Sequence, residues 1–178
     1  MNTDIEIPGD IILSRLNKKD KSFLIKYLND FDIYKNTSNI PHPYTSKDAE
    51  WWIKHVKDKA RQTGRLSNFA IRDKNLNLIG GIGFHTKYGI KSHKDEIGYW
   101  LAKDYWNKGI MTKVVKKFCE IGFGENKLLR IEAVVFENNF ASARVLEKNG
   151  FIKEGFLRKY LIKDNIPLNT YLYSLIKE

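Results

Sequence analysis

The residues from 95 to 123 constrain the fold most, because the period of the apolar side chains changes within this segment. The run "DEIGYWLA" has the length and composition of a β-strand. From Gly109 onward, apolar residues recur every three or four positions with lysines on the opposite side, as in an amphipathic helix. The predicted buried positions are Ile110, Met111, Val114, Val115, Phe118 and Ile121. A strand that enters such a helix through a short loop requires a sheet with a helix packed against it.

Strands and helices alternate along the rest of the chain. Short or alternating apolar runs predict strands at 11–16, 68–73, 78–84, 129–136 and 170–176. Helical spacing predicts one helix across 18–31, with Phe31 on its buried face. A second helix begins after Thr45, which has Asp48 at capping-box spacing, and continues to Ala60. These elements indicate an α/β or α+β protein with a mixed sheet.

The composition, with 42% hydrophobic and 29% charged residues among 178, is that of a globular protein. No repeat, low-complexity tract or linker interrupts it, so we expect one domain over residues 1–178. The single cysteine, Cys119, has no internal disulfide partner, and no apolar run is long enough to cross a bilayer. We therefore expect a soluble cytoplasmic protein, either a monomer or a homodimer. The net charge of +10 favours anionic partners, but the lysines are spread along the chain, which favours a solvated basic surface over a nucleic-acid patch.

The short loop before the helix is a candidate anion site. It brings the helix start close to the carboxyl end of the strand at 95–102. A helix start carries unpaired backbone N–H groups and about half a positive charge, and both attract anions. Gly109 allows a ligand to approach the backbone, Lys108 adds charge, and Thr112 adds a hydroxyl. An ordinary strand-to-helix turn has the same pattern, so the residues alone leave both interpretations open.

Two segments, "EIGYWLAKDYWNKGIMTKVV" and "LRIEAVVFENNFASARVLEKNGFIKEG", together resemble the GNAT N-acetyltransferase superfamily. Within it they are similar to the RimJ/RimL-like branch, which includes the ribosomal-protein N-terminal acetyltransferases. The likeness covers about residues 10 to 178 in pattern and is specific in these two segments. It implies the GNAT fold, a mixed and mostly antiparallel sheet of about seven strands with helices on both faces. It also implies acetyl-CoA as co-substrate.

The resemblance assigns residues to the coenzyme. The superfamily motif R/Q-x-x-G-x-G/A, whose backbone N–H groups hold the coenzyme diphosphate, falls on residues 106–111. Trp106 replaces the Arg or Gln and Met111 replaces the small residue, although the branch commonly has this tryptophan. A second motif, N-x-x-S, is met by Asn139 and Ser142. The coenzyme-binding residues implied by the resemblance are Leu101, Asn107, Lys108, Gly109, Ile110, Met111, Thr112, Asn139 and Ser142.

The same likeness implies catalytic roles. An amine attacks the thioester directly, so the reaction needs a donor for the developing oxyanion and a proton source for the thiolate. In this fold a strand N–H near Leu101 is the expected oxyanion donor, and Ser142 is the expected acid, because Leu146 stands where many relatives have a tyrosine. Glu96 is a candidate base acting through water, with a surface or structural strand carboxylate as the alternative.

Structural roles also explain several of these residues. Asn is a residue type preferred at helix N-caps, which suits Asn139. Gly150 suits a left-handed helix C-cap. The hydroxyl of Ser142 has a second interpretation, a hydrogen bond back to its own helix. For Cys119, on the helix after the loop, a small core residue is the better explanation than a nucleophile.

The remaining motifs do not support dinucleotide binding or metal binding. "GGIG" at 80–83 echoes a dinucleotide fingerprint, but no helix follows it, so strand glycines or a bulge are expected. The histidines lack metal-ligand spacing, and we expect no metal. We expect an acetyl-CoA-dependent N-acetyltransferase with no specific nucleic-acid or membrane partner. Its acceptor is a protein N-terminus, such as that of a ribosomal protein, or a polyamine or other small amine. The alternatives are a basic nucleic-acid-binding module without catalysis and a GNAT-like domain that binds CoA without turnover.

Overall fold

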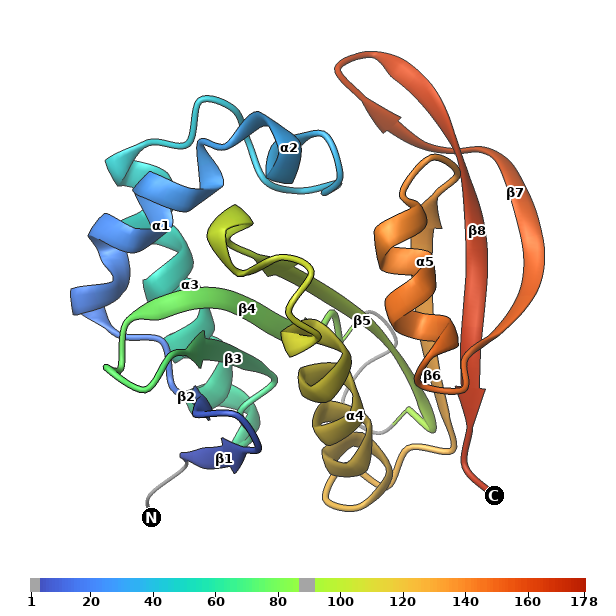
Figure 1. Cartoon of the computed structure of the whole chain (residues 1–178), viewed down its shortest axis with the longest axis horizontal. Coiled ribbons are helices and arrows are strands. Elements are labelled where there is room, and N and C mark those ends of the chain that lie inside the picture. Colours follow the sequence, from blue (N-terminus) through green and yellow to red (C-terminus); the bar gives the residue numbers. More distant parts are fainter. Residues whose placement is uncertain (1–3, 87–91) are drawn as a thin grey trace. The chain divides into compact units, whose positions relative to one another are not determined.

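The computed structural model describes residues 4–86 and 92–178 (Figure 1). Its strands are β1 (Ile5–Ile7), β2 (Ile11–Ser14), β3 (Asn68–Arg72), β4 (Leu78–Phe84), β5 (Lys94–Leu101), β6 (Arg130–Phe136), β7 (Ile152–Lys163) and β8 (Ile166–Ile176). Its helices are α1 (Lys21–Leu28), α2 (Phe31–Tyr34), α3 (Ser46–Thr63), α4 (Ile110–Phe123) and α5 (Phe140–Glu147), with short 3-10 turns η1 (Lys18–Asp20) and η2 (Lys103–Tyr105).

In the described residues, eight strands follow the order β1-β2-β3-β4-β5-β6-β8-β7. The β5–β6 pair is parallel, whereas β1–β2, β2–β3, β3–β4, β6–β8 and β7–β8 are antiparallel. The expected mixed, mostly antiparallel sheet with flanking helices is therefore confirmed. The sequence pattern did not separate the short β1 or the long β7 as strands.

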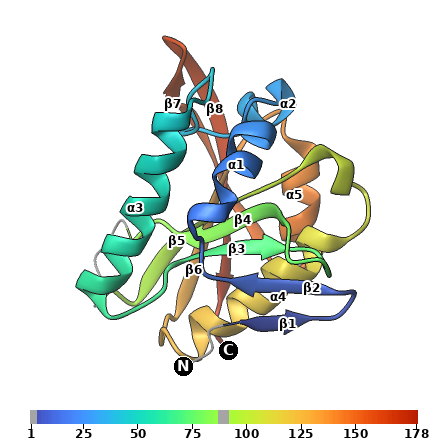
Figure 2. The same ribbon diagram turned by 90° about the vertical axis from the view of Figure 1, so that its left-hand side faces the viewer.

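The described chain divides into two compact units. The first runs to Gly83 and includes Tyr99–Ile110, and the second comprises Phe84–Gly98 and Met111–Glu178. Figure 2 shows β1, β2 and β3 side by side in the first unit. That the whole chain acts as one domain stays a prediction.

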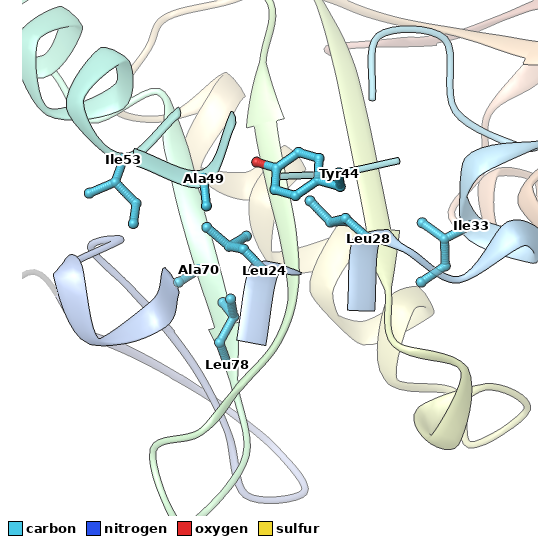
Figure 3. Close-up of a cluster of buried hydrophobic side chains, with 8 residues drawn as sticks. All are labelled: Leu24, Leu28, Ile33, Tyr44, Ala49, Ile53, Ala70 and Leu78. Atoms are coloured by element: carbon cyan, nitrogen blue, oxygen red, sulfur yellow. The ribbon is translucent and has the colours of Figure 1, made fainter. Parts of the chain in front are cut away.

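The core of the first unit forms where α1 and α3 pack on β3 and β4 (Figure 3). Its buried side chains are Leu24, Leu28, Ile33, Tyr44, Ala49, Ile53, Ala70 and Leu78. The predicted capping box at the start of α3 is present, because Thr45 and Asp48 exchange side-chain and backbone hydrogen bonds. Trp100 and Trp106 pack against this core from the β5 end of the unit. The core therefore reaches the loop that precedes α4.

The prediction of one helix across 18–31 is wrong. The α-helix ends at Leu28, and Asp30 adopts an extended conformation and caps α2 by accepting a hydrogen bond from the N–H of Asp32 at 2.8 Å. Phe31 begins α2 and is 62% exposed, so it does not belong to the buried face. The reason is that short polar side chains such as Asp bond to nearby backbone and favour a new helix start over continuation of the old one.

The glycines of "GGIG" lie within β4, as strand glycines, and each of the three has a close neighbour, which for Gly83 is the side chain of Asn68. A Cβ on Gly80 would lie 2.6 Å from the carbonyl oxygen of Trp100, and one on Gly81 would lie 2.7 Å from Trp100 Nε1. A register shift in the β3–β4 pair between Ile71 and Arg72 adds the irregularity expected beside such residues. Gly80 and Gly81 therefore serve the packing of the β5 end.

In the second unit, α4 is the amphipathic helix that the sequence predicts. All but one of its predicted apolar positions are buried; Ile110 is half-buried, and the ring centroids of Phe118 and Phe84 are 4.4 Å apart. Helix α5 is joined to the first turn of α4 by a hydrogen bond from Asn149 Nδ2 to the carbonyl oxygen of Thr112 at 3.2 Å. Tyr173 of β8 donates to the Glu147 carboxylate at 3.3 Å. Helix α5 is thus fixed at its C-terminal end.

Candidate functional site

The loop between β5 and α4 is anchored to the first unit at several points. The N–H of Ala102 donates to the carbonyl of Ile79 at 2.8 Å, which continues the strand pairing past the end of β5. Trp106 Nε1 donates to the carbonyl of Leu101 at 2.7 Å, and the indole packs on the core. The hydroxyl of Tyr105 donates a hydrogen bond to the carboxylate of Asp73 at 3.2 Å, and Lys103 forms an ion pair with Asp32. The loop is therefore held by side chains to which the sequence analysis gave no anchoring role.

Two residues of this loop have left-handed backbone conformations. Asn107 has a φ of 59° and Gly109 a φ of 70°, on either side of Lys108. A Cβ built on Gly109 meets no heavy atom within 4 Å, so the space beside this backbone is open. The ammonium of Lys108 donates to the carbonyl of Asp104 at 2.8 Å and lies 5.5 Å from the ring centroid of Tyr105. The predicted anion loop therefore has an accessible backbone at its glycine.

The first turn of α4 follows directly in the chain. As at any helix start, the backbone N–H groups of this turn have no carbonyl acceptor within the helix itself. Ile110 and Thr112 are half-buried, whereas the side chain of Met111 is buried with 7% exposure. The side chain that replaces the small residue of the motif is thus buried in the core.

Asn139 and Ser142 come together at the start of α5. Asn139 is the N-cap, and its Oδ1 accepts a hydrogen bond from the N–H of Ser142 at 3.1 Å. The capping interpretation of Asn139 is therefore confirmed, and the role of its side chain toward a coenzyme stays a prediction. At the other end of α5, Gly150 has a φ of 80°, and the N–H of Phe151 donates to the carbonyl of Leu146 at 3.1 Å. The predicted left-handed cap is present.

Glu96 lies in β5 within the second unit and is largely buried, with 12% of its side chain exposed. Its Oε1 is 3.2 Å from Nδ1 of His85, the residue that follows β4. Its neighbour Asp95 is buried and accepts hydrogen bonds from the N–H groups of Thr86 and Glu96, each at 2.9 Å. The pairing of Glu96 with an imidazole is a feature that the sequence did not reveal, because His85 follows β4 whereas Glu96 lies in β5.

The remaining expectations concern the cysteine, metal binding and membrane-spanning helices. Cys119 is buried, and burial raises the pKa of its thiol to about 12, so the core interpretation is confirmed. Within residues 4–86 and 92–178, no cluster of His, Cys, Asp and Glu is suited to a metal ion. None of the helices described there is long and apolar enough to span a membrane.

The predicted site residues fall in both units. Leu101, which is buried at the end of β5, and residues 107–110 belong to the first. Glu96, Met111, Thr112, Asn139 and Ser142 belong to the second. The contribution of Trp106 as an anchor had one signal in the sequence, the bulky aromatic pair of Tyr105 and Trp106 before a polar loop.

Comparison with known proteins gives a consistent result. The chain matches the family model of the acetyltransferase (GNAT) domain over residues 10–152. An uncharacterized N-acetyltransferase of Bacillus licheniformis, p20, is 30% identical over 168 residues, which cover 94% of this chain and 93% of that protein. Two Bacillus subtilis proteins match over a little more than half of their own lengths. The uncharacterized N-acetyltransferase YoaA is 44% identical over 100 residues, which cover 56% of each chain. The putative ribosomal N-acetyltransferase YdaF is 35% identical over 101 residues, which cover 57% of this chain and 55% of YdaF.

Solved structures share the fold across nearly the whole chain. A GNAT-family acetyltransferase from Bacillus anthracis superposes with a TM-score of 0.82 at 26% identity, over 98% of each chain. The microcin C7 self-immunity acetyltransferase MccE, solved with acetyl-CoA and AMP, has a TM-score of 0.86 at 20% identity, over 99% of this chain and 98% of its own. Mycobacterium smegmatis RimJ, solved with a CoA-disulfide, has a TM-score of 0.81 at 20% identity, over 97% of this chain and 85% of its own.

Family model, curated relatives and fold agree on one class, the enzymes that transfer an acetyl group to nitrogen. The chain belongs to the GNAT acetyltransferase family. The resemblance drawn from the two sequence segments is thereby confirmed.

Proposed function

We propose that this chain transfers the acetyl group of acetyl-CoA to a primary amine by direct attack in a ternary complex, with the α-amino group of a protein, such as a ribosomal protein, as acceptor. The observation that carries the proposal is the open, left-handed backbone of Gly109 at the start of α4. Support comes from the fold neighbours solved with acetyl-CoA or CoA and from the relative named a putative ribosomal N-acetyltransferase. Small amines and polyamines are the alternative acceptors.

The backbone from Asn107 to Thr112 holds the coenzyme diphosphate in this proposal. Successive N–H groups and the dipole of α4 supply partial positive charge, so the diphosphate needs few charged side chains. Gly109 leaves room for the ligand, and Trp106 keeps the loop in place through its bond to the Leu101 carbonyl. Asn139 and Ser142, at the start of α5, bind the thioester end of the coenzyme. The loop geometry is thus built before the ligand arrives.

The chemistry requires a protonated acceptor amine to give up two protons, one before the attack and one as the amide forms, and the leaving group to take up one. An α-amino group is largely protonated at neutral pH, so Glu96, through a water molecule, takes the proton that frees the nitrogen lone pair. The nitrogen forms a bond to the thioester carbon, and the N–H of the strand near Leu101 stabilises the oxyanion. As the carbon–sulfur bond breaks, the hydroxyl of Ser142 gives the thiolate a hydrogen bond or a proton, and the second proton lost by the nitrogen makes up the one that the thiolate takes. The products are the N-acetylated amine and free CoA.

An amine panel tests this function. The chain is mixed with acetyl-CoA and, in separate reactions, a peptide with a free N-terminus, the same peptide already acetylated, and spermidine, and release of the CoA thiol is followed. We expect release with the free peptide and none above background with the acetylated one. Release with spermidine alone would move the acceptor to the small amines. Acetyl-CoA that binds in calorimetry without thiol release from any amine would identify a coenzyme-binding domain without turnover.

A further inference from the structure

A row of polar side chains crosses the sheet of the second unit. Glu96 of β5 lies directly opposite Glu132 of β6, and Glu132 lies opposite Ser174 of β8. Side chains of directly paired residues point to the same face of a sheet. The row therefore contains two neighbouring carboxylates, and what each of them contacts determines its chemistry.

Glu132 and a further carboxylate, Glu154 of β7, are bound to cationic side chains. Glu132 lies 2.6 Å from Arg130 Nε and 3.2 Å from Lys94 Nζ. Glu154 accepts two hydrogen bonds from Arg130, at 3.0 and 2.6 Å, and one from Ser174 at 2.5 Å. The hydrogen bonds from Arg130, and then from Ser174, lower the pKa of Glu154 to about 2. A carboxylate held in this way stays ionised and is a poor proton acceptor.

Glu96 differs because it contacts a group that can itself take up a proton. Its Oε1 is 3.2 Å from Nδ1 of His85, and the N–H of His85 donates to the carbonyl of Glu96 at 2.9 Å. On the other side of the ring, a Cβ on Gly98 would lie 2.5 Å from Nε2, so the imidazole lies directly against the β5 backbone. The exposed fraction of the His85 side chain is 39%, compared with 12% for Glu96. The imidazole thus connects a shielded carboxylate to solvent.

We infer that His85 is a positioning residue for Glu96: its Nδ1–H donates to the carboxylate and fixes it for its work as base. This inference rests on the proposed function, in which Glu96 receives a proton from the amine through water. After the acetyl transfer, the Glu96 carboxyl returns the proton to bulk water through the same water molecule, and Nδ1 of His85 keeps its proton throughout. Among the described residues, charged groups on the two strands at this pair include Glu132 and Arg130 on β6 and Lys94 and Asp95 on β5.

Three variants separate positioning from packing. His85→Phe keeps a ring over Gly98 but removes both nitrogens, whereas His85→Asn retains an N–H donor near the Nδ1 position and does not titrate. His55→Asn is the matched control, because His55 is an exposed imidazole stacked on Trp51 at 4.9 Å. We expect His85→Phe to lower kcat about tenfold or more with KM for acetyl-CoA unchanged, a modest share of what a general base contributes. His85→Asn should recover most of this loss near neutral pH, and its kcat profile should lose one ionisation.

The outcomes that overturn the inference are distinct from those that overturn the function. A wild-type chain active on an amine, with His85→Phe within about twofold of its kcat, would remove His85 from the reaction while the function stands. An equal loss in both His85 variants, or a loss confined to KM, would also overturn it. A readout independent of turnover is the ¹⁵N resonance of His85 Nδ1, which we expect to move in Glu96→Gln, and an unmoved resonance contradicts the pairing. A wild-type chain inactive on every amine would overturn function and inference together.

Discussion

At Gly109 a single added carbon atom tests the coenzyme site. Alanine at a φ near 70° is strained by about 1–2 kcal/mol, and its methyl group would occupy the space that is open beside the loop. We expect Gly109→Ala to weaken acetyl-CoA binding by at least about tenfold, or about 1.4 kcal/mol, in a calorimetric titration.

Gly64 provides the matched control for this change. It ends α3 with a φ of 67° and, like Gly109, has no heavy atom within 4 Å of a built Cβ. Gly64→Ala should therefore lower the free energy of unfolding by a similar amount and leave acetyl-CoA binding unchanged. Equal binding by both variants would show that the coenzyme diphosphate does not lie at Gly109.

Ser142 is the residue at which catalysis and helix capping are separable. The cap of α5 uses the backbone N–H of Ser142, so Ser142→Ala keeps it. We expect kcat at saturating acetyl-CoA to fall about tenfold to hundredfold, with a smaller loss of stability than removal of the cap causes. Asn139→Ala, in contrast, removes the cap and should destabilise the fold by about 0.5–2 kcal/mol. An unchanged kcat in Ser142→Ala would remove its hydroxyl from the mechanism.

Among the elements, β2, η1 and β3 are joined by one buried ion pair. Arg72 binds both carboxylate oxygens of Asp20, at 2.7 and 2.9 Å, and donates from Nε to Ser14 at 2.5 Å. Removing one partner leaves the other charge buried, so Asp20→Ala should lower the free energy of unfolding by about 3–5 kcal/mol in urea titration.

Two further variants check this assignment. Asp58→Ala removes an exposed partner of Lys54 on α3, and we expect no measurable change in stability. Replacing both buried partners, with Arg72→Met and Asp20→Leu together, should recover most of the loss, because no charge is then left unpaired. A loss in Asp20→Ala no larger than that in Asp58→Ala would mean that the pair does not stabilise this unit.

The elements themselves were predictable where periodicity and caps agreed. Helix α4 and the hairpin of β3 and β4 follow from apolar spacing and a polar turn, and α3 follows from its capping box. The helix across 18–31 failed because the apolar period continues to Phe31 although Asp30 starts a new helix. Spacing alone does not show which of two neighbouring polar residues interrupts a helix.

At the scale of the whole molecule, the class of protein was predictable and the partners of its residues were not. Two motif segments sufficed to identify the family, because a glycine followed by a helix start has the spacing of the family's motif. The contact between His85 and Glu96 joins two strands, and the bond from Trp106 to Leu101 depends on how a loop folds back. Such pairings are set by tertiary packing, which a single sequence does not encode in its local pattern.

The indole of Trp106 couples the loop before α4 to the stability of the first unit. Because this side chain rests on the same apolar cluster that holds α1 and α3 together, the loop and the cluster order as one body. Any molecule that prefers the ordered loop then shifts the folding equilibrium in favour of the native chain, by an amount that grows with the logarithm of its concentration. Supply of the coenzyme would in this way govern how long the enzyme persists, as well as how fast it works.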